Sequence, residues 1–175
     1  MRAEPARPRR TAIGVDAVAR DCRRLVRRQA LKAAGVSALP VAGVDLFING
    51  KLLASTIEQI SAAHGLAPDQ LARLPAPLRN QVDDLTQEIG SYLIGRVITQ
   101  GALFTALRAL GLRVGAQQAA KLAPVAGLAA SAALSGWMFK RLCDRHIAQC
   151  QQVRTALPQL PAPQPVLALA APVGE

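Results

Sequence analysis

The chain has 175 residues, enough for one domain with a single core. Hydrophobic residues make up 51% of it and aromatic residues only 3%, so small and aliphatic side chains must fill the interior. The net charge of +10 is concentrated at the start, where residues 1–33 carry ten lysines and arginines against three acidic residues. Three cysteines without framework spacing argue against a disulfide-stabilised secreted domain and favour reduced thiols in the cytoplasm.

The first predicted helix is basic and amphipathic. Residues 1–13 are rich in proline and arginine, and we expect them to be disordered. From Val15, apolar residues follow a three-four spacing typical of a helix. Basic residues on its other faces are the predicted binding site for an anionic surface: Arg20, Arg23, Arg24, Arg27, Arg28 and Lys32.

Two interpretations of this helix stay open. It is either a solvated arginine-rich helix that packs its apolar stripe on the domain, or an electrostatic anchor to anionic lipid. Nucleic-acid binding is the weaker alternative, because no aromatic residues are interleaved with the arginines.

A turn is predicted after this helix. Pro40 ends or kinks the helix because it lacks an N–H, and Gly43 gives the backbone the freedom to turn. Asp45 is placed to cap or begin the next helix, which we expect over residues 44–64. Gly65 is a natural stop for that helix.

The middle of the chain is predicted to be helical as well. A short helix is expected over residues 68–74, followed by a break at the Pro-Ala-Pro sequence of residues 75–77. A long helix is then expected from residue 77 to about residue 110. Ser91, Gly95 and Thr99 would form a narrow row on it that lets another helix approach closely.

The most apolar stretch, residues 122–139, contains no charged residue. A helix over residues 116–122 leads to a turn at Pro124 and Gly127, and a final helix is expected over residues 127–157. The stretch is at the lower length limit for a membrane span, and Pro124 shortens it further. We therefore predict a buried or re-entrant hairpin, with an alanine-rich soluble core helix as the alternative. Residues 158–175 are expected to form a proline-rich disordered tail.

The sequence Pro-Val-Ala-Gly occurs twice, at residues 40–43 and at residues 124–127. This repetition predicts an all-α fold, a compact helical bundle built on two pseudo-repeated apolar helical hairpins with disordered termini. The single domain would span residues 14–157, with repeat cores at about residues 30–65 and 116–150.

Cys143, His146 and Cys150 are the strongest candidates for metal chemistry. Their spacing puts all three on one side of a helix, and thiolate and imidazole are ligands that zinc prefers. One helix does not easily direct three such side chains at one ion, and a fourth ligand would have to come from Cys22 or His64. We therefore expect ordinary core residues here and no metal, cofactor or catalytic site. Phosphate-loop, dinucleotide-binding and hydrolase motifs are also absent from the sequence, which favours a protein that is not an enzyme.

The two turns give the chain a resemblance to known families. Pro40, Gly43 and Asp45, then His64-Gly65, then Pro124 and Gly127 resemble the pattern of the EcsC-like proteins and of a bacterial domain of unknown function found after some GTPase domains, with YcjF-like relatives. The similarity covers about residues 30–150. It implies a helical, membrane-associated protein of poorly known function. The chain differs in having His64 where those families often have tyrosine, and it contains no GTPase domain.

These observations predict a non-enzymatic protein bound to the cytoplasmic face of the inner membrane, either peripherally or by an inserted hairpin. The basic helix would supply electrostatic attraction and the apolar hairpin would supply burial. The alternative is a soluble helical interaction module, or an adaptor for a GTPase or transporter. The sequence gives no indication of an oligomeric state.

Overall fold

The computed structural model describes residues 9–37, 44–109 and 126–164. These residues form helices and no strand: α1 (Arg9–Ser37), α2 (Val44–Ala63), α3 (Pro68–Ala72), α4 (Ala76–Glu88), α5 (Gln100–Ala109) and α7 (Ala126–Ala156). The all-α fold predicted from the sequence is therefore confirmed. α1 begins earlier than the expected start at Val15.

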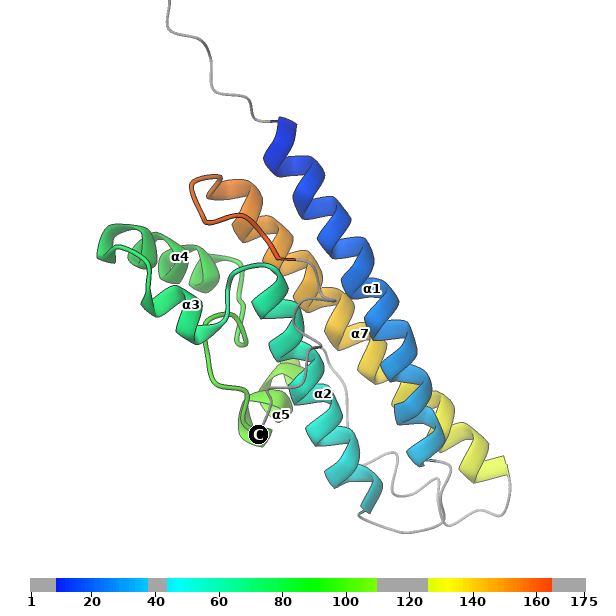
Figure 1. Ribbon diagram of the computed structural model, residues 1–175. Coiled ribbons are helices and arrows are strands. Elements are labelled where there is room, and N and C mark those ends of the chain that lie inside the picture. Colours follow the sequence, from blue (N-terminus) through cyan, green and yellow to red (C-terminus); the bar gives the residue numbers. More distant parts are fainter. Residues whose placement is uncertain (1–8, 38–43, 110–125, 165–175) are drawn as a thin grey trace, which may run out of the picture.

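Two long helices, α1 and α7, lie side by side and run in opposite directions (Figure 1). They share the most extensive contact in the bundle, and α2 packs against both. α5 packs on α2, and α4 packs on α7. As a result, the end of α1 and the beginnings of α2 and α7 lie at the same end of the bundle (Figure 1).

The core lies between α1, α2 and α7. Its fully buried aliphatic side chains include Val26 from α1, Ile57 and Ile60 from α2, and Ile147 and Val153 from α7. The apolar stripe predicted on α1 is also buried, since Val15, Val18 and Cys22 all face the core. Burial of this stripe, and not the intrinsic helix preference of an arginine-rich segment, is what stabilises α1.

Close approach of α1 and α7 depends on small residues. A Cβ atom at Gly136 would lie 3.3 Å from the backbone oxygen of Ala30 and 3.4 Å from the Cβ of Ala34. Gly136 belongs to one of the small-residue rows visible in the sequence of the last helix. Any side chain there would push the two longest helices apart.

Two glycines with positive φ end helices. Gly65 (φ 70°) follows α2, where the N–H of Leu66 donates to the carbonyl of Ser61 over 2.8 Å. Gly90 (φ 62°) follows α4 in the same way, with the N–H of Ser91 donating to the carbonyl of Thr86. This left-handed cap satisfies carbonyls that a helix end leaves free, and glycine adopts it without strain. The stop predicted at Gly65 is confirmed.

The long helix predicted from residue 77 to about 110 is wrong. α4 ends at Glu88, residues 89–99 are irregular, and α5 begins at Gln100. The cause is the pair Gly90 and Gly95, whose positive φ values take the backbone out of the helical region. Ser91, Gly95 and Thr99 therefore do not form a row on a helix.

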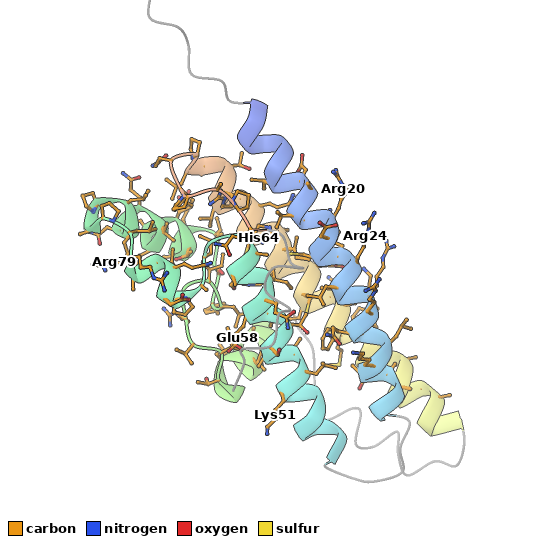
Figure 2. The ribbon with its side chains drawn as sticks, viewed as in Figure 1. Arg20, Arg24, Lys51, Glu58, His64 and Arg79 are labelled. Carbon is orange, nitrogen blue, oxygen red and sulfur yellow. The ribbon has the colours of Figure 1, made fainter. Side chains whose placement is uncertain are left out.

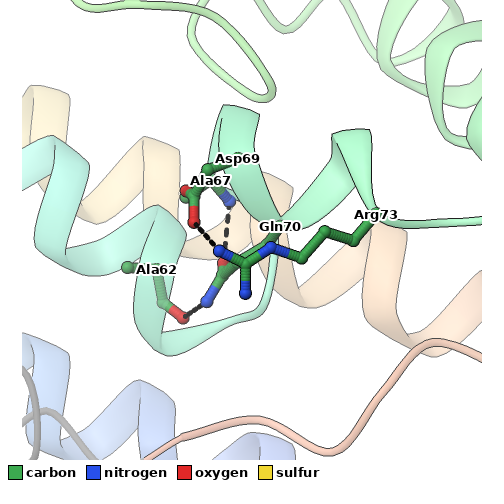
Figure 3. Close-up of polar contacts among 5 residues, drawn as sticks. All are labelled: Ala62, Ala67, Asp69, Gln70 and Arg73. Atoms are coloured by element: carbon green, nitrogen blue, oxygen red, sulfur yellow. Dashed lines mark hydrogen bonds and ion pairs between the residues drawn. The ribbon is translucent and has the colours of Figure 1, made fainter.

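The connection between α2 and α3 is fixed by one side chain (Figure 3). The Gln70 amide accepts from the Ala67 N–H over 3.0 Å and donates to the carbonyl of Ala62 over 3.1 Å. Asp69 of α3 and Arg73, the residue that follows α3, form an exposed ion pair. The Gln70 side chain therefore supplies a hydrogen-bond partner both for a backbone N–H at the start of α3 and for a backbone carbonyl at the end of α2.

The segment after α7 packs on the bundle. Leu160 is buried, and the N–H of Gln164 donates to the carbonyl of Ala63 over 2.9 Å. Pro163 lies against Gly14 of α1. Packed structure thus continues beyond the boundary at residue 157 that we expected, because these residues cover the end of α2.

Residues 9–13, which we expected to be disordered, belong to α1. Several predicted features lie outside the described residues: residues 1–8 and 165–175 of the two expected disordered tails, the turn residues Pro40, Gly43 and Pro124, and the helix over residues 116–122. Asp45 lies in the first turn of α2 and Gly127 near the start of α7. The pairing of two repeated hairpins stays a prediction.

Within the three described segments, none of the helices combines the length and the apolar character needed to cross a membrane.

Candidate functional site

The outer face of α1 carries the predicted basic residues. Arg20, Arg24, Arg27 and Leu31 are separated by four, three and four residues, so they share one stripe on the helix surface. All four side chains are exposed, opposite the stripe that faces the core. Figure 2 shows Arg20 and Arg24 pointing away from the rest of the bundle. Exposed basic residues also flank the stripe: Arg23, Arg28 and Lys32.

Most of this positive charge is not neutralised within the protein. Arg24 lies 3.5 Å from Asp21, and Arg23 donates to the side-chain oxygen of Gln151 over 3.1 Å. Among the described residues, no ion pair involves the remaining four, Arg20, Arg27, Arg28 and Lys32. Such a surface attracts anions of many kinds, because long-range electrostatic attraction depends on charge and only weakly on the shape of the partner.

Leu31 lies at the C-terminal end of this basic stripe, one turn after Arg27 and Arg28 and next to Lys32. It is 76% exposed, the most exposed large hydrophobic residue in the described chain. A single exposed leucine is common, but here basic residues lie on the helix turns around it. The combination places an apolar side chain where the cations would meet an anionic surface.

The outer face of α7 carries a second group of residues that the sequence analysis missed. Trp137 is 51% exposed, and the Arg141 guanidinium lies 5.6 Å from the centre of its ring. Lys140 forms an ion pair with Asp144, and Arg145 is exposed one turn beyond Arg141. The spacing of four between Trp137, Arg141 and Arg145 is visible in the sequence and could have revealed the group.

Two contacts fix how α1 and α7 are aligned along their lengths. Near one end, Arg23 of α1 binds Gln151 of α7, and Gln151 in turn donates to Asp16 over 3.2 Å. Near the other end, Gly136 lies against Ala30 and Ala34. Because the helices are antiparallel, these contacts put Leu31 at the level of Trp137 and Lys140.

A polar cluster lies inside the bundle, between α2 and α7. The Ser61 hydroxyl and His146 Nε2 share a hydrogen bond of 2.8 Å, and the Cys150 sulfur lies 3.7 Å from the same nitrogen. All three side chains are buried. Burial, together with the nearby His64 ring, lowers the pKa of His146 to about 3, so its imidazole is neutral near pH 7.

This Ser–His pair has little room for a substrate. The hollow that reaches His146 has a volume of about 20 Å³ and is also lined by Tyr92, Arg145 and Gln149. That volume admits one water molecule and no organic molecule. The His146 Nδ1 atom has no protein hydrogen-bond partner. We interpret the pair as a link between α2 and α7.

His64 and Arg154 form the other buried polar group. His64 donates from Nδ1 to the carbonyl of Ile60 over 2.8 Å, and burial lowers its pKa, with a smaller contribution from Arg154. Arg154 is 1% exposed and donates to the carbonyl of Pro161. This bond ties the segment after α7 to the helix itself, close to the Gly65 turn.

The three cysteines are buried thiols. Burial raises the pKa of Cys22 to about 12 and raises the pKa of Cys143 and Cys150 further. The structure brings together two of the candidate metal ligands, since the Cys150 sulfur lies 3.7 Å from His146 Nε2. In the part of the chain that the structure describes, however, no three His, Cys, Asp or Glu side chains are arranged to hold a metal ion.

Comparison of the chain with protein-family models, with curated proteins and with solved structures found no match. The resemblance to EcsC-like and GTPase-associated domains stays a prediction.

Proposed function

We propose that the protein is a peripheral membrane-binding helical bundle that attaches to anionic phospholipid on the cytoplasmic face of the inner membrane. The observation that carries the proposal is the exposed stripe on α1 that contains Arg20, Arg24, Arg27 and Leu31. In this reading α7, α2 and the segment after α7 form the scaffold that keeps the stripe outward.

Electrostatic attraction is the main force in this proposal. Each lysine or arginine held near an anionic bilayer contributes about 1 kcal/mol. The six exposed basic residues of α1 would together contribute about 6 kcal/mol, which corresponds to a dissociation constant of roughly tens of micromolar. Among the described residues, only Arg23 and Arg24 of these six bind a side chain of the protein itself. Attachment of this kind weakens as salt screens the charges.

Apolar burial is a smaller contribution. Leu31 is the exposed apolar residue within the basic stripe. The part of the charge-free stretch that belongs to α7 exposes one large apolar side chain, Trp137, beside the small alanines Ala129, Ala130 and Ala133, which bury little area each. We therefore favour attachment at the surface over insertion of a hairpin.

Co-sedimentation with vesicles tests the proposal. The protein is mixed with vesicles of phosphatidylcholine alone or of phosphatidylcholine with phosphatidylglycerol, and the pelleted fraction is measured at increasing salt. We expect binding only with phosphatidylglycerol and release by salt. Equal recovery with both vesicle types, or no recovery with either, is incompatible with the proposal.

A soluble interaction module, such as an adaptor for a GTPase or transporter, is the second candidate. It is favoured by the irregular segment 89–99, where Val97 is 72% exposed and Tyr92 is 48% exposed. These side chains lie in the segment between α4 and α5, away from the basic stripe in sequence. If the protein binds no vesicle but is retained by a partner from the same cell, and Val97→Ser abolishes the retention, this second function replaces the first.

A further inference from the structure

The hollow beside Trp137 on α7 is the most distinctive surface feature outside the α1 stripe. It has a volume of about 460 Å³ and is lined by Trp137, Lys140, Arg141, Asp144 and Arg145. The five residues lie on one outer face of α7, so the hollow is a depression open to solvent and not an enclosed cavity. The lining combines one aromatic ring with three cations and a single carboxylate.

The charges in this hollow are unevenly paired. Asp144 is bound to Lys140, which leaves the Arg141 and Arg145 guanidinium groups without a carboxylate partner among the described residues. Arg141 is held over the Trp137 ring, which positions its planar group without neutralising it. Guanidinium groups bind phosphate through two parallel hydrogen bonds, so the hollow suits a phosphate-bearing ligand.

Trp137 indicates which kind of phosphate-bearing ligand the hollow suits. An indole ring has an apolar body and one N–H donor, and tryptophan is enriched where a membrane meets water. A small soluble phosphate offers no apolar layer for a half-exposed ring. A phospholipid offers both a phosphate and an adjoining apolar layer.

One border of the hollow lies on the edge of α7 that runs along α1, and Arg141 and Arg145 lie further around the helix. Gln151, which binds Arg23 of α1, marks the edge of α7 that lies along α1. Asp144 and Lys140 precede Gln151 by seven and eleven residues, so they lie on that same edge. The Gly136 contact puts Leu31 at the level of Trp137. A membrane surface can therefore contact the outer face of α1 and the Trp137 side of the hollow at the same time.

We propose that the hollow lined by Trp137, Arg141 and Arg145 binds the headgroup of an anionic phospholipid. Binding there orients the bundle with the outer faces of α1 and α7 against the membrane. This inference rests on the proposed membrane attachment, since α1 brings the protein to the surface and the hollow sets its orientation.

Trp137 is the only tryptophan in the chain, so its fluorescence reports on this site directly. The full-length protein is titrated with phosphatidylglycerol-containing vesicles while emission and co-sedimentation are recorded on the same samples. We expect a blue shift that follows binding, and quenching by lipids brominated near the headgroup end of the acyl chain. Sedimentation without a blue shift or quenching overturns the headgroup site but leaves the proposed function intact. Absence of sedimentation overturns both.

A double variant distinguishes specific binding in the hollow from general electrostatic attraction to the membrane. Arg141→Gln with Arg145→Gln keeps Trp137 and should weaken vesicle affinity roughly thirtyfold and reduce the blue shift. The control, Arg73→Gln with Arg79→Gln, removes the same charge from exposed positions on and next to α3 and α4 and should keep the shift. Equal effects of the two variants contradict a specific site. A blue shift of the same size with duplex DNA contradicts a lipid ligand.

Discussion

Ser61 of α2 and His146 of α7 share a buried hydrogen bond of 2.8 Å, although 85 residues separate them in the chain. Each side chain is nearly inaccessible to solvent. The bond is therefore a structural link between two core helices. Removing Ser61 leaves the buried His146 Nε2 with only the Cys150 sulfur, 3.7 Å away, as a weak partner. Such a loss costs more than the net contribution of the bond itself.

Ser61→Ala should lower the free energy of unfolding by about 1–3 kcal/mol. The physical reason is that His146 Nε2 would lose this partner in a dry environment, where its other ring nitrogen is already unpaired. Ser55→Ala, on the exposed side of α2, is the matched control and should change stability by less than about 0.5 kcal/mol. Urea unfolding of both variants checks this, and equal stability of the two would show that the pair contributes nothing.

Stability should fall as the pH falls below 6.5. In the folded protein the pKa of His146 is lowered from 6.5 to about 3, and the pKa of His64 is lowered as well. The unfolded chain therefore binds more protons than the folded chain in this window, so acid favours unfolding. The stability from His146 is fully present above pH 6.5 and is lost progressively as pH falls from 6.5 toward 3.

For His146 alone, the free energy of unfolding should decrease by about 2 kcal/mol between pH 7 and pH 5. Urea unfolding at a series of pH values measures the slope. His146→Asn should be less stable at pH 7 but should show a shallower pH dependence. An unchanged slope in this variant would mean that His146 does not cause the loss of stability at low pH.

Gly95 and Gly50 should respond to alanine in opposite directions. Gly95 has φ 71°, and a Cβ there would lie 2.7 Å from Cδ1 of Leu71. Gly95→Ala should therefore cost about 1–3 kcal/mol. Gly50 lies within α2 with open space around its Cβ position, so Gly50→Ala should stabilise by roughly 0.5–1 kcal/mol. Thermal unfolding of both variants is the measurement. Changes in melting temperature of the same sign would contradict the different roles assigned to Gly95 and Gly50.

The cysteines should be unreactive in the native protein. Cys22, Cys143 and Cys150 are buried and their pKa values are raised, so very little thiolate is present near neutral pH. A chromogenic disulfide reagent should label all three only after denaturant is added. Rapid labelling of the native protein would show that the core opens more readily than this packing implies.

The sequence predicted the helices with clear periodicity or strong stop signals. The apolar stripe of α1 and the stop at Gly65 follow from spacing and from glycine chemistry. The break between α4 and α5 was missed because Gly95 fitted a small-residue row with Ser91 and Thr99 as well as it fits a turn, and Gly90 was not weighed as a helix stop. Only their backbone conformation, which depends on contacts such as Gly95 with Leu71, distinguishes the two.

The candidate site was predicted in part. The arginines of α1 are recognisable from charge alone, and their exposure follows from the opposing apolar stripe. The group at Trp137 was missed because the surrounding stretch is apolar and was interpreted as interior. The buried Ser61–His146 pair depends on the packing of α2 against α7, and no local pattern could reveal it.

The most direct test of membrane attachment is the vesicle affinity of a variant with Arg20, Arg24 and Arg27 all changed to glutamine. The control carries the same change at Arg73, Arg79 and Arg96, which are exposed outside α1. At an ionic strength of about 0.1 M, we expect the α1 variant to bind phosphatidylglycerol-containing vesicles roughly a hundredfold more weakly than the unmodified protein. The control should lose far less affinity. Equal affinities of the two variants would contradict attachment through α1.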